Sequence, residues 1–222
     1  MRIIITGLGP GDCGLLSVTA LKAAQDADVI IVPGAHSERI MRHYVPDKKI
    51  LRVPFPMTRD KGACSSRIRI ELEALRSDWE GVSTIFFPVI GDAMLYSTGA
   101  YMLEEMRELV PDLEAVFIPG ISAHSLAASC AKRFLAMGED IFTIIPGTAD
   151  EGRIRRALEH CDAAAIYKPK ALHNLRELAC GFSRIVRVDY AGFPELERIS
   201  EGIDALDEID DYMTVILLWR NC

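Results

Sequence analysis

Two hydrophobic patterns alternate along the chain. Short runs of apolar, β-rich residues have the length of buried strands, and longer stretches with apolar residues every three or four positions have the period of amphipathic helices. Predicted strands in the first half cover residues 2–6, 29–32, 85–90 and 113–118. Strands that alternate with helices in this way are typical of an α/β fold.

The second half has shorter units that indicate more antiparallel pairing. Predicted strands there cover residues 141–145, 163–167, 184–190 and 212–219, and predicted helices cover 123–134, 151–160 and 170–180. Because the rhythm changes near Phe117, we predict two α/β domains, residues 1–117 and 118–222, with a cofactor cleft between them. The basic, proline-punctuated stretch from Pro33 to Gly62 is expected to be irregular.

The apolar run at 85–90 ends at Gly91 and Asp92, and a helical pattern follows at once. Glycine lets the backbone turn sharply and approach a ligand without a Cβ in the way. Ligands of open α/β sheets lie beyond the carboxyl ends of the strands, where this turn is expected. We therefore predict that Gly91 and Asp92 form the floor of a small-molecule site.

A second turn of this kind, Pro119-Gly120-Ile121-Ser122, follows the strand at 113–118. Ser122 is suited to two roles that the sequence leaves open. It can cap the next helix, or it can present its hydroxyl and the free N–H groups of the helix start to a ligand. His124 follows in the same turn.

The first loop contains Gly9, Gly11 and Gly14, which match the G-x-G-x-x-G template of dinucleotide-binding folds. Pro10 removes an N–H from the loop that would cradle a pyrophosphate. The helical pattern starts late, with Ser17 or Thr19 as its cap, and the next strand ends in Pro33-Gly34 rather than in the acid that would hold a ribose. An NAD-dependent oxidoreductase is therefore disfavoured.

Charge is unevenly distributed over the 222 residues. The formal net charge is −7, which disfavours generic nucleic-acid binding. Residues 31–76 nevertheless contain ten Lys or Arg against five acids. Such a region suits an anionic small ligand, although a solvated charged surface is an equal alternative.

The six cysteines and five histidines show no metal-type spacing and no Cys-x-x-Cys motif. With no signal peptide, we expect reduced thiols in a cytoplasmic protein, and no metal site. No apolar run approaches the ~20 residues needed to span a bilayer.

Three segments, taken in order, resemble the tetrapyrrole methylases: Gly7-Leu8-Gly9-Pro10-Gly11-Asp12, Gly91-Asp92 with Tyr96-Ser97-Thr98, and Pro119-Gly120-Ile121-Ser122. These are S-adenosylmethionine-dependent enzymes of corrin and sirohaem synthesis, and the resemblance covers nearly the whole chain. Three details are most similar to the branch that methylates C20 of precorrin-2 or cobalt-factor II. They are Pro146-Gly147-Thr148 before a helix, a strand that ends in Lys168, and the closing segment 211–217.

The resemblance implies a homodimer of two α/β domains with S-adenosylmethionine folded in the cleft. By motif, it implies cofactor contacts from the first, second and third loops and, more loosely, from the second half. These residues are Pro10, Gly91, Asp92, Leu95, Ser122, Ala123, Tyr167, Gly192 and Met213. The implied substrate is a tetrapyrrole rich in carboxylates, which gives the basic region a purpose. We expect Arg39, Arg52 and Arg67 to pair with those carboxylates.

The chain also departs from the family pattern. Ala93 stands where the family usually has proline, and Cys13-Gly14 replaces the usual Pro-Glu. Pro33 falls where related enzymes that methylate uroporphyrinogen carry an aspartate, so no general base is transferred. We expect Gly/Pro loops and backbone carbonyls to orient the reactants, with no acid/base dyad. Methylation at C5/C15, C11 or C17 of a later intermediate, or non-catalytic cofactor binding, remains an alternative.

Overall fold

The computed structural model describes residues 1–56 and 61–221, and it divides the chain into two compact units. The first unit is Met1–Ser122 and the second is Ala123–Cys222. The predicted boundary after Phe117 cuts the last strand of the first sheet, because that strand pairs in register through Ile118. The division therefore falls at the turn beyond that strand, after Ser122.

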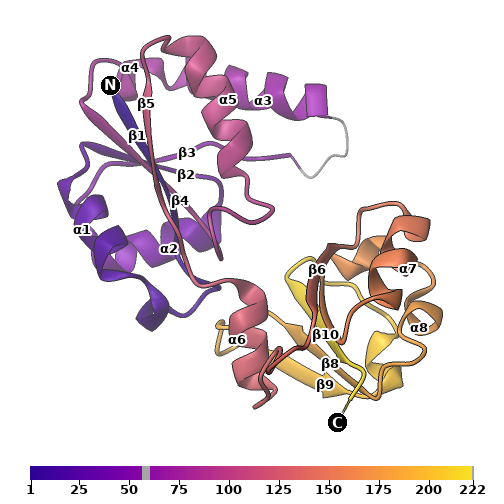
Figure 1. Cartoon of the computed structure of the whole chain (residues 1–222). Helices are drawn as coiled ribbons and strands as arrows, with labels where there is room; N and C mark the ends of the chain where they lie inside the picture. Colours follow the sequence, from indigo (N-terminus) through magenta and orange to yellow (C-terminus); the bar gives the residue numbers. More distant parts are fainter. Residues whose placement is uncertain (57–60, 222) are drawn as a thin grey trace. The chain divides into compact units, whose positions relative to one another are not determined.

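The first unit contains a five-stranded parallel sheet in the order β3-β2-β4-β1-β5 within the described residues (Figure 1). Its strands are β1 (Arg2–Gly7), β2 (Val29–Val32), β3 (Ile50–Arg52), β4 (Thr84–Val89) and β5 (Glu114–Ile118). Its helices are α1 (Val18–Asp26), α2 (Ala35–Tyr44), α3 (Lys61–Ala74), α4 (Arg76–Trp79) and α5 (Gly99–Leu109), with a 3₁₀ turn η1 (Cys13–Leu15).

Helices cover both faces of this sheet, so the unit has three layers. On one face, Ile68 of α3 and Met102 of α5 pack against Ile3 and Ile5 of β1. On the other face, helices α1 and α2 pack against the alternate positions of the same strands, including Ile4. Strands covered on both sides are apolar throughout, which is why β1, β2 and β4 appear in the sequence as uninterrupted hydrophobic runs.

The prediction of an irregular stretch from Pro33 to Gly62 is wrong at residues 35–44 and 50–52, and its residues 57–60 lie outside the described part of the chain. Helix α2 and strand β3 lie within it, and α3 begins at Lys61. The apolar face of α2 is narrow, because Ile40 and Met41 alone among its hydrophobic side chains are fully buried. The surrounding basic residues therefore obscured the helical period.

The second unit contains a mixed sheet in the order β6-β7-β10-β8-β9 among the residues described (Figure 1). Its strands are β6 (Phe142–Pro146), β7 (Ala163–Tyr167), β8 (Arg184–Asp189), β9 (Arg198–Glu201) and β10 (Thr214–Trp219). Its helices are α6 (Ala123–Cys130), α7 (Glu151–Glu159) and α8 (Leu175–Leu178), with 3₁₀ turns η2 (Pro169–Ala171) and η3 (Ile203–Leu206). Among the described strands of this sheet, only β6 and β7 pair in parallel, which agrees with the predicted antiparallel character.

Helix α6 covers one face of the second sheet, and α7 and α8 cover the other. The helix predicted at 170–180 is broken into η2 and α8, and the edge strand β9 was not predicted. All four residues of β9 are exposed, so it lacks the apolar alternation that would mark a strand. In the part of the chain that the structure describes, no helix is long and apolar enough to cross a membrane.

Candidate functional site

The carboxyl ends of β1, β4 and β5 lie side by side at one edge of the first sheet, because β1 pairs in parallel with both neighbours. The connection that leaves β1 passes through α1 on one face, and the connection that leaves β4 passes through α5 on the other. Ligands of open α/β sheets bind where the connections diverge in this way. The first and second glycine loops both begin at this point.

The two loops are joined by backbone hydrogen bonds. Gly91 N–H donates to the Gly9 carbonyl oxygen at 2.7 Å, and Gly9 N–H donates to the Gly91 carbonyl oxygen at 3.2 Å. Pro10 directly follows this bridge, and Leu95 N–H donates to the Asp92 carbonyl oxygen at 3.3 Å. The structure therefore brings Pro10, Gly91, Asp92 and Leu95 into one group of loops.

The Asp92 carboxylate connects the second loop to the third. Its Oδ1 accepts hydrogen bonds from the N–H groups of Met94 at 3.1 Å and Gly120 at 3.3 Å. The Ser122 hydroxyl lies 3.4 Å from Asp92 Oδ2 and donates to it. Asp92 and Ser122 are thus neighbours at one edge of one sheet, and the hydroxyl of Ser122 acts on another loop rather than on its own helix.

Glycine at the strand ends allows an unusually close approach of three backbones. A Cβ on Gly7 would lie 2.4 Å from the Gly91 carbonyl oxygen and 2.7 Å from the Gly120 Cα, and a Cβ on Gly120 would lie equally close to Gly91. Gly91 itself has φ +80°, and a Cβ there would meet no atom within 4 Å. The turn therefore has a rigid backbone floor with open space in front of it, which fits a bound small molecule.

The predicted site residues of the second unit gather at one edge of the second sheet. Tyr167 ends β7, Gly192 follows β8, and Met213 precedes β10. Because β10 runs antiparallel to β7 and β8, its start lies beside their ends. Tyr190 N–H donates to the Met213 carbonyl oxygen at 2.7 Å, so these two segments are in direct contact.

Tyr167 also holds the start of α6. Its Oη accepts a hydrogen bond from the His124 N–H at 3.1 Å and lies 2.8 Å from His124 Nδ1. Ala123 is the residue immediately before His124, so the predicted contacts Ala123 and Tyr167 belong to one local cluster. The sequence had marked the turn at His124 without indicating this partner, since 43 residues separate the two side chains.

The three arginines predicted to bind substrate are spread over separate elements of the first unit. Arg39 is exposed on α2. Arg52 Nε donates to Glu38 Oε2 at 3.1 Å, and Arg67 of α3 pairs with Glu71 at 2.7 Å. Both ion pairs are on the surface, where such pairs contribute little to stability.

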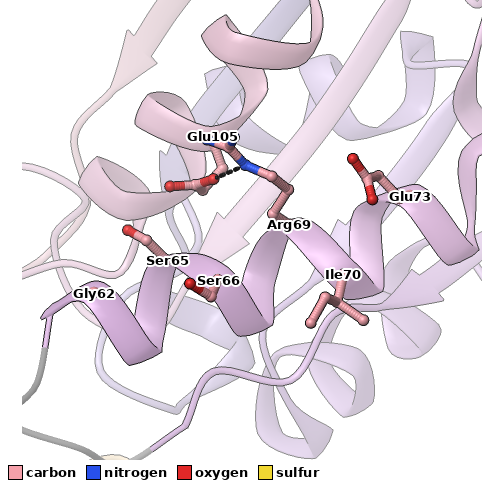
Figure 2. A pocket seen from close by; sticks show the side chains of 7 residues that line it. All are labelled: Gly62, Ser65, Ser66, Arg69, Ile70, Glu73 and Glu105. Atoms are coloured by element: carbon pink, nitrogen blue, oxygen red, sulfur yellow. Dashed lines mark hydrogen bonds and ion pairs between the residues drawn. The ribbon is translucent and has the colours of Figure 1, made fainter.

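A cavity of about 450 Å³ lies between α3 and α5 (Figure 2). Arg69 Nε donates to Glu105 Oε2 at 2.8 Å across it, and Ser65, Ser66 and Glu73 line its wall. Glu105 is a carboxylate buried in the core face of α5, and Arg69 compensates its charge. Within the described residues, no group of His, Cys, Asp and Glu is arranged to hold a metal ion.

Glycine loops that converge at the switch point of a parallel sheet, in a chain with a second, mixed α/β unit, are typical of a site for a small molecule. Residues 2–202 match the family profile of Tetrapyrrole (Corrin/Porphyrin) Methylases. The chain belongs to this family.

Two relatives of this chain are named for methylation at C20. A precorrin-2 C(20)-methyltransferase of Sinorhizobium sp. is 30% identical, over 99% of this chain and 96% of its own length. The cobalt-precorrin-2 C(20)-methyltransferase of Salmonella typhimurium is 29% identical, over 75% of this chain and 72% of its own length.

Solved structures share the fold at lower identity. The X-ray structure of a cobalt precorrin-4 methyltransferase has a TM-score of 0.69 at 22% identity and covers 98% of this chain and 94% of its own. A uroporphyrin-III C-methyltransferase of Thermus thermophilus, complexed with S-adenosylhomocysteine, has a TM-score of 0.69 at 18% identity, over 99% and 92% of the two chains. Diphthine synthase has a TM-score of 0.61 at 17% identity, over 99% and 90%, so the fold by itself does not define the substrate.

Proposed function

We propose that the chain transfers a methyl group from S-adenosylmethionine to C20 of precorrin-2 or cobalt-factor II, in cobalamin (corrin) biosynthesis. The observation that carries the proposal is the clamp, the pair of hydrogen bonds by which Asp92 holds Gly120 and Ser122 beside the glycine floor. The chain that contains it is similar over its whole length to a C20-methyltransferase. An enzyme of this kind needs a preformed surface that holds the donor in one orientation. The clamp provides such a surface at the switch point of the sheet.

The cofactor contacts form two groups. Pro10, Gly91, Asp92, Leu95 and Ser122 lie at the glycine floor of the first unit. Tyr167, Gly192 and Met213 lie at the strand ends of the second, and Ala123 begins helix α6. The open space before Gly91 fits a ligand there, since nothing lies within 4 Å of its Cβ position. The Asp92 carboxylate accepts hydrogen bonds from two backbone N–H groups, so its role is to fix the loops.

Orientation and exclusion of water account for the rate enhancement. When bound, S-adenosylmethionine supplies a methyl group already activated by its sulfonium. The chain must align that methyl group with the nucleophilic ring carbon at near-contact distance. Correct orientation alone can lower the barrier by ~7–11 kcal/mol. The rigid floor formed by Gly7, Gly91 and Gly120 serves this purpose because three backbones fix one another there.

Besides the cofactor, the chain must bind the carboxylates of its tetrapyrrole substrate. Arg39, Arg52 and Arg67 are exposed on the first unit, and the known partners of Arg52 and Arg67 are surface acids. Exchange of a surface ion pair for a bidentate pair with a substrate carboxylate costs little, because the surface pair itself contributes little.

We further propose that the enzyme acts as a homodimer in the cytoplasm. The described cysteines are all free thiols, which suits a reducing compartment. Size-exclusion chromatography with light scattering tests the dimer, and a mass equal to one chain at all concentrations would contradict it.

Methylation at another ring carbon is the second candidate. A probable cobalt-factor III C(17)-methyltransferase of Salmonella typhimurium is 26% identical, but over only 56% of this chain. Parallel incubations with precorrin-2 and cobalt-factor II, followed by mass spectrometry, decide between the substrates. One added methyl group on either compound supports the proposal, whereas products formed only from later, already C20-methylated intermediates would refute it.

A further inference from the structure

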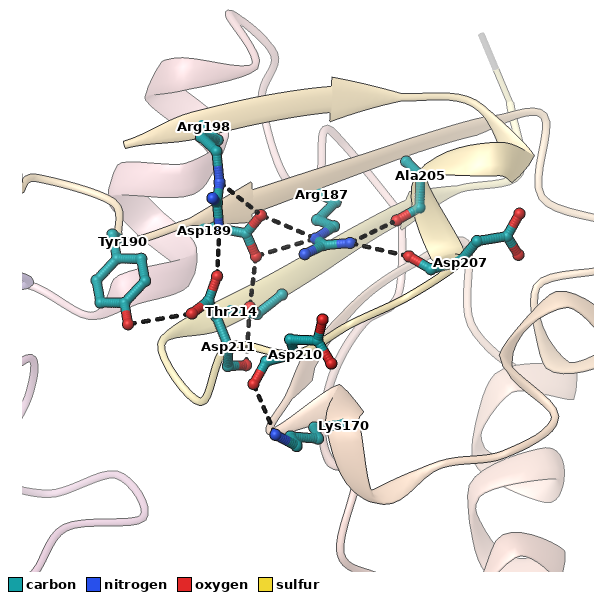
Figure 3. Close-up of polar contacts among 10 residues, drawn as sticks. All are labelled: Lys170, Arg187, Asp189, Tyr190, Arg198, Ala205, Asp207, Asp210, Asp211 and Thr214. Atoms are coloured by element: carbon teal, nitrogen blue, oxygen red, sulfur yellow. Dashed lines mark hydrogen bonds and ion pairs between the residues drawn. The ribbon is translucent and has the colours of Figure 1, made fainter. Parts of the chain in front are cut away.

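A buried carboxylate lies at the end of β8, in the second unit. Asp189 is only 2% exposed. Its oxygens accept hydrogen bonds from Arg187 Nε at 2.9 Å and from the Thr214 hydroxyl at 2.5 Å, and Arg198 Nε lies 3.8 Å away (Figure 3). A buried charge of this kind is costly unless it is fully paired, and here several donors converge on one carboxylate.

This carboxylate lies between two segments of the proposed cofactor site. Asp189 is followed by Tyr190, Ala191 and Gly192, and Thr214 is preceded by Met213. Asp189 and Thr214 face each other in the β8–β10 ladder, so their side-chain hydrogen bond is added to the sheet pairing. One residue further on, Tyr190 N–H donates to the Met213 carbonyl oxygen. The segments that contain Gly192 and Met213 are therefore both attached to the hydrogen-bonded pair Asp189–Thr214, which we call the junction at Asp189.

Tyr190, the residue after Asp189, is held in an unfavourable backbone conformation. Tyr190 has φ +50° and Gly192 has φ +81°. A non-glycine residue in the left-handed region persists only where its surroundings fix it, and such residues gather at functional sites. The Tyr190 hydroxyl donates to Asp211 Oδ1 at 3.2 Å, and Arg198 also pairs with Asp211. Burial, and then the Asp211 carboxylate, raise the pKa of Tyr190, so its hydroxyl keeps the proton that it donates.

We propose that Asp189 is a positioning residue, which holds segments 190–192 and 211–213 in the geometry that binds S-adenosylmethionine. The inference rests on the proposed function. Stability of the sheet alone does not require this carboxylate, because β8 and β10 pair along six residues and an apolar pair at the first position would fit a buried ladder. The buried carboxylate of Asp189 is instead explained by the conformation that its hydrogen bonds impose on segments 190–192 and 211–213.

The test compares Asp189→Asn and Thr214→Val with wild type in the full chain. Isothermal titration gives the Kd for S-adenosylhomocysteine, and steady-state kinetics give kcat at saturating donor and KM for the tetrapyrrole. Loss of one charge-assisted hydrogen bond should raise the Kd about tenfold in Asp189→Asn. We expect kcat at saturating donor and KM for the tetrapyrrole to change less than twofold, about the scatter of such kinetic measurements. Thr214→Ser, which keeps the hydroxyl, should restore wild-type affinity.

Asp204→Asn is the matched control, since it makes the same charge change at a side chain that is 88% exposed and pairs with Arg176. Its Kd should equal that of wild type. If wild type binds S-adenosylhomocysteine and folded Asp189→Asn binds it equally well, the inference is overturned. If Asp189→Asn does not fold, equal affinities of Thr214→Val and Thr214→Ser overturn it instead. If wild type itself shows no binding, the proposed function fails and the inference fails with it.

Discussion

At the scale of single residues, the site depends on the absence of side chains as much as on their presence. Gly7 and Gly120 approach Gly91 at distances that a Cβ on either would prevent, and Gly91 itself has φ +80°. Asp92 then uses its carboxylate to join the second and third loops. In the function that we propose, the orientation of a bound donor depends on this backbone geometry, so small changes at these positions should have large effects on binding.

Substitution Gly120→Ala should distort the floor of the site. The added Cβ would lie 2.4 Å from the Gly91 carbonyl oxygen, and overpacking of this kind costs about 1–3 kcal/mol. We expect a lower melting temperature and a Kd for S-adenosylhomocysteine raised at least about tenfold. Gly34→Ala is the control, because Gly34 has extended backbone and no atom within 4 Å of its Cβ position. Equal binding by the two variants would contradict the role given to Gly120.

The buried thiols should react slowly. Burial raises the pKa of Cys64, with Glu105 adding to the shift, and burial likewise raises the pKa of Cys161. A raised pKa leaves less thiolate at a given pH, and thiolate is the reactive form. At pH 8, iodoacetamide should therefore modify exposed Cys180 well before Cys64 or Cys161, as read by peptide mass spectrometry. If Cys64 or Cys161 is modified before Cys180 in the folded protein, that thiol is not buried in the core.

At the scale of elements, strands with many buried side chains could be predicted from the sequence, and elements with few buried side chains could not. Strands β1, β2 and β4 were predicted because burial on both faces makes them continuously apolar. Helix α2 was missed because few of its side chains are buried, and β9 was missed because all of its residues are exposed. The glycine turns at Gly91 and Gly120 were visible in the sequence. The bond from Ser122 to Asp92 was not, since it joins residues 30 positions apart through tertiary packing.

The start of α1 is an element that the sequence did specify. Ser17, which was one of two predicted caps, has extended backbone, and its side chain accepts a hydrogen bond from Ala20 N–H at 3.1 Å. Replacement by alanine should lower the free energy of unfolding by about 1 kcal/mol, whereas aspartate should be nearly neutral. Urea denaturation measures both, and equal stability of Ser17→Ala and wild type would show that the cap contributes nothing.

At the scale of the whole molecule, two layered α/β units each contribute predicted contacts at a sheet edge. The first supplies the glycine floor, and the second supplies the junction at Asp189. The distribution of charge is also a property of the whole chain, because a protein with a net charge of −7 places its basic excess in residues 31–76. A substrate with many carboxylates would be attracted to that region rather than to the remaining surface.

Alanine variants of Arg39, Arg52 and Arg67 test this use of charge. Each should raise the KM for the tetrapyrrole by about five- to tenfold, with the Kd for S-adenosylhomocysteine unchanged. Arg176→Ala is the control, since Arg176 is an exposed, ion-paired arginine outside the basic region. If the KM for the tetrapyrrole is unchanged in all three variants, these arginines do not bind the substrate.

The central claim is that this chain methylates C20. The direct measurement is ¹³C NMR of the product formed from precorrin-2 or cobalt-factor II with S-adenosylmethionine labelled in its methyl group. The account predicts a single new methyl signal whose carbon is bonded to C20. A labelled methyl group at any other ring carbon, or no transfer to either compound by a protein that binds S-adenosylhomocysteine, would contradict it.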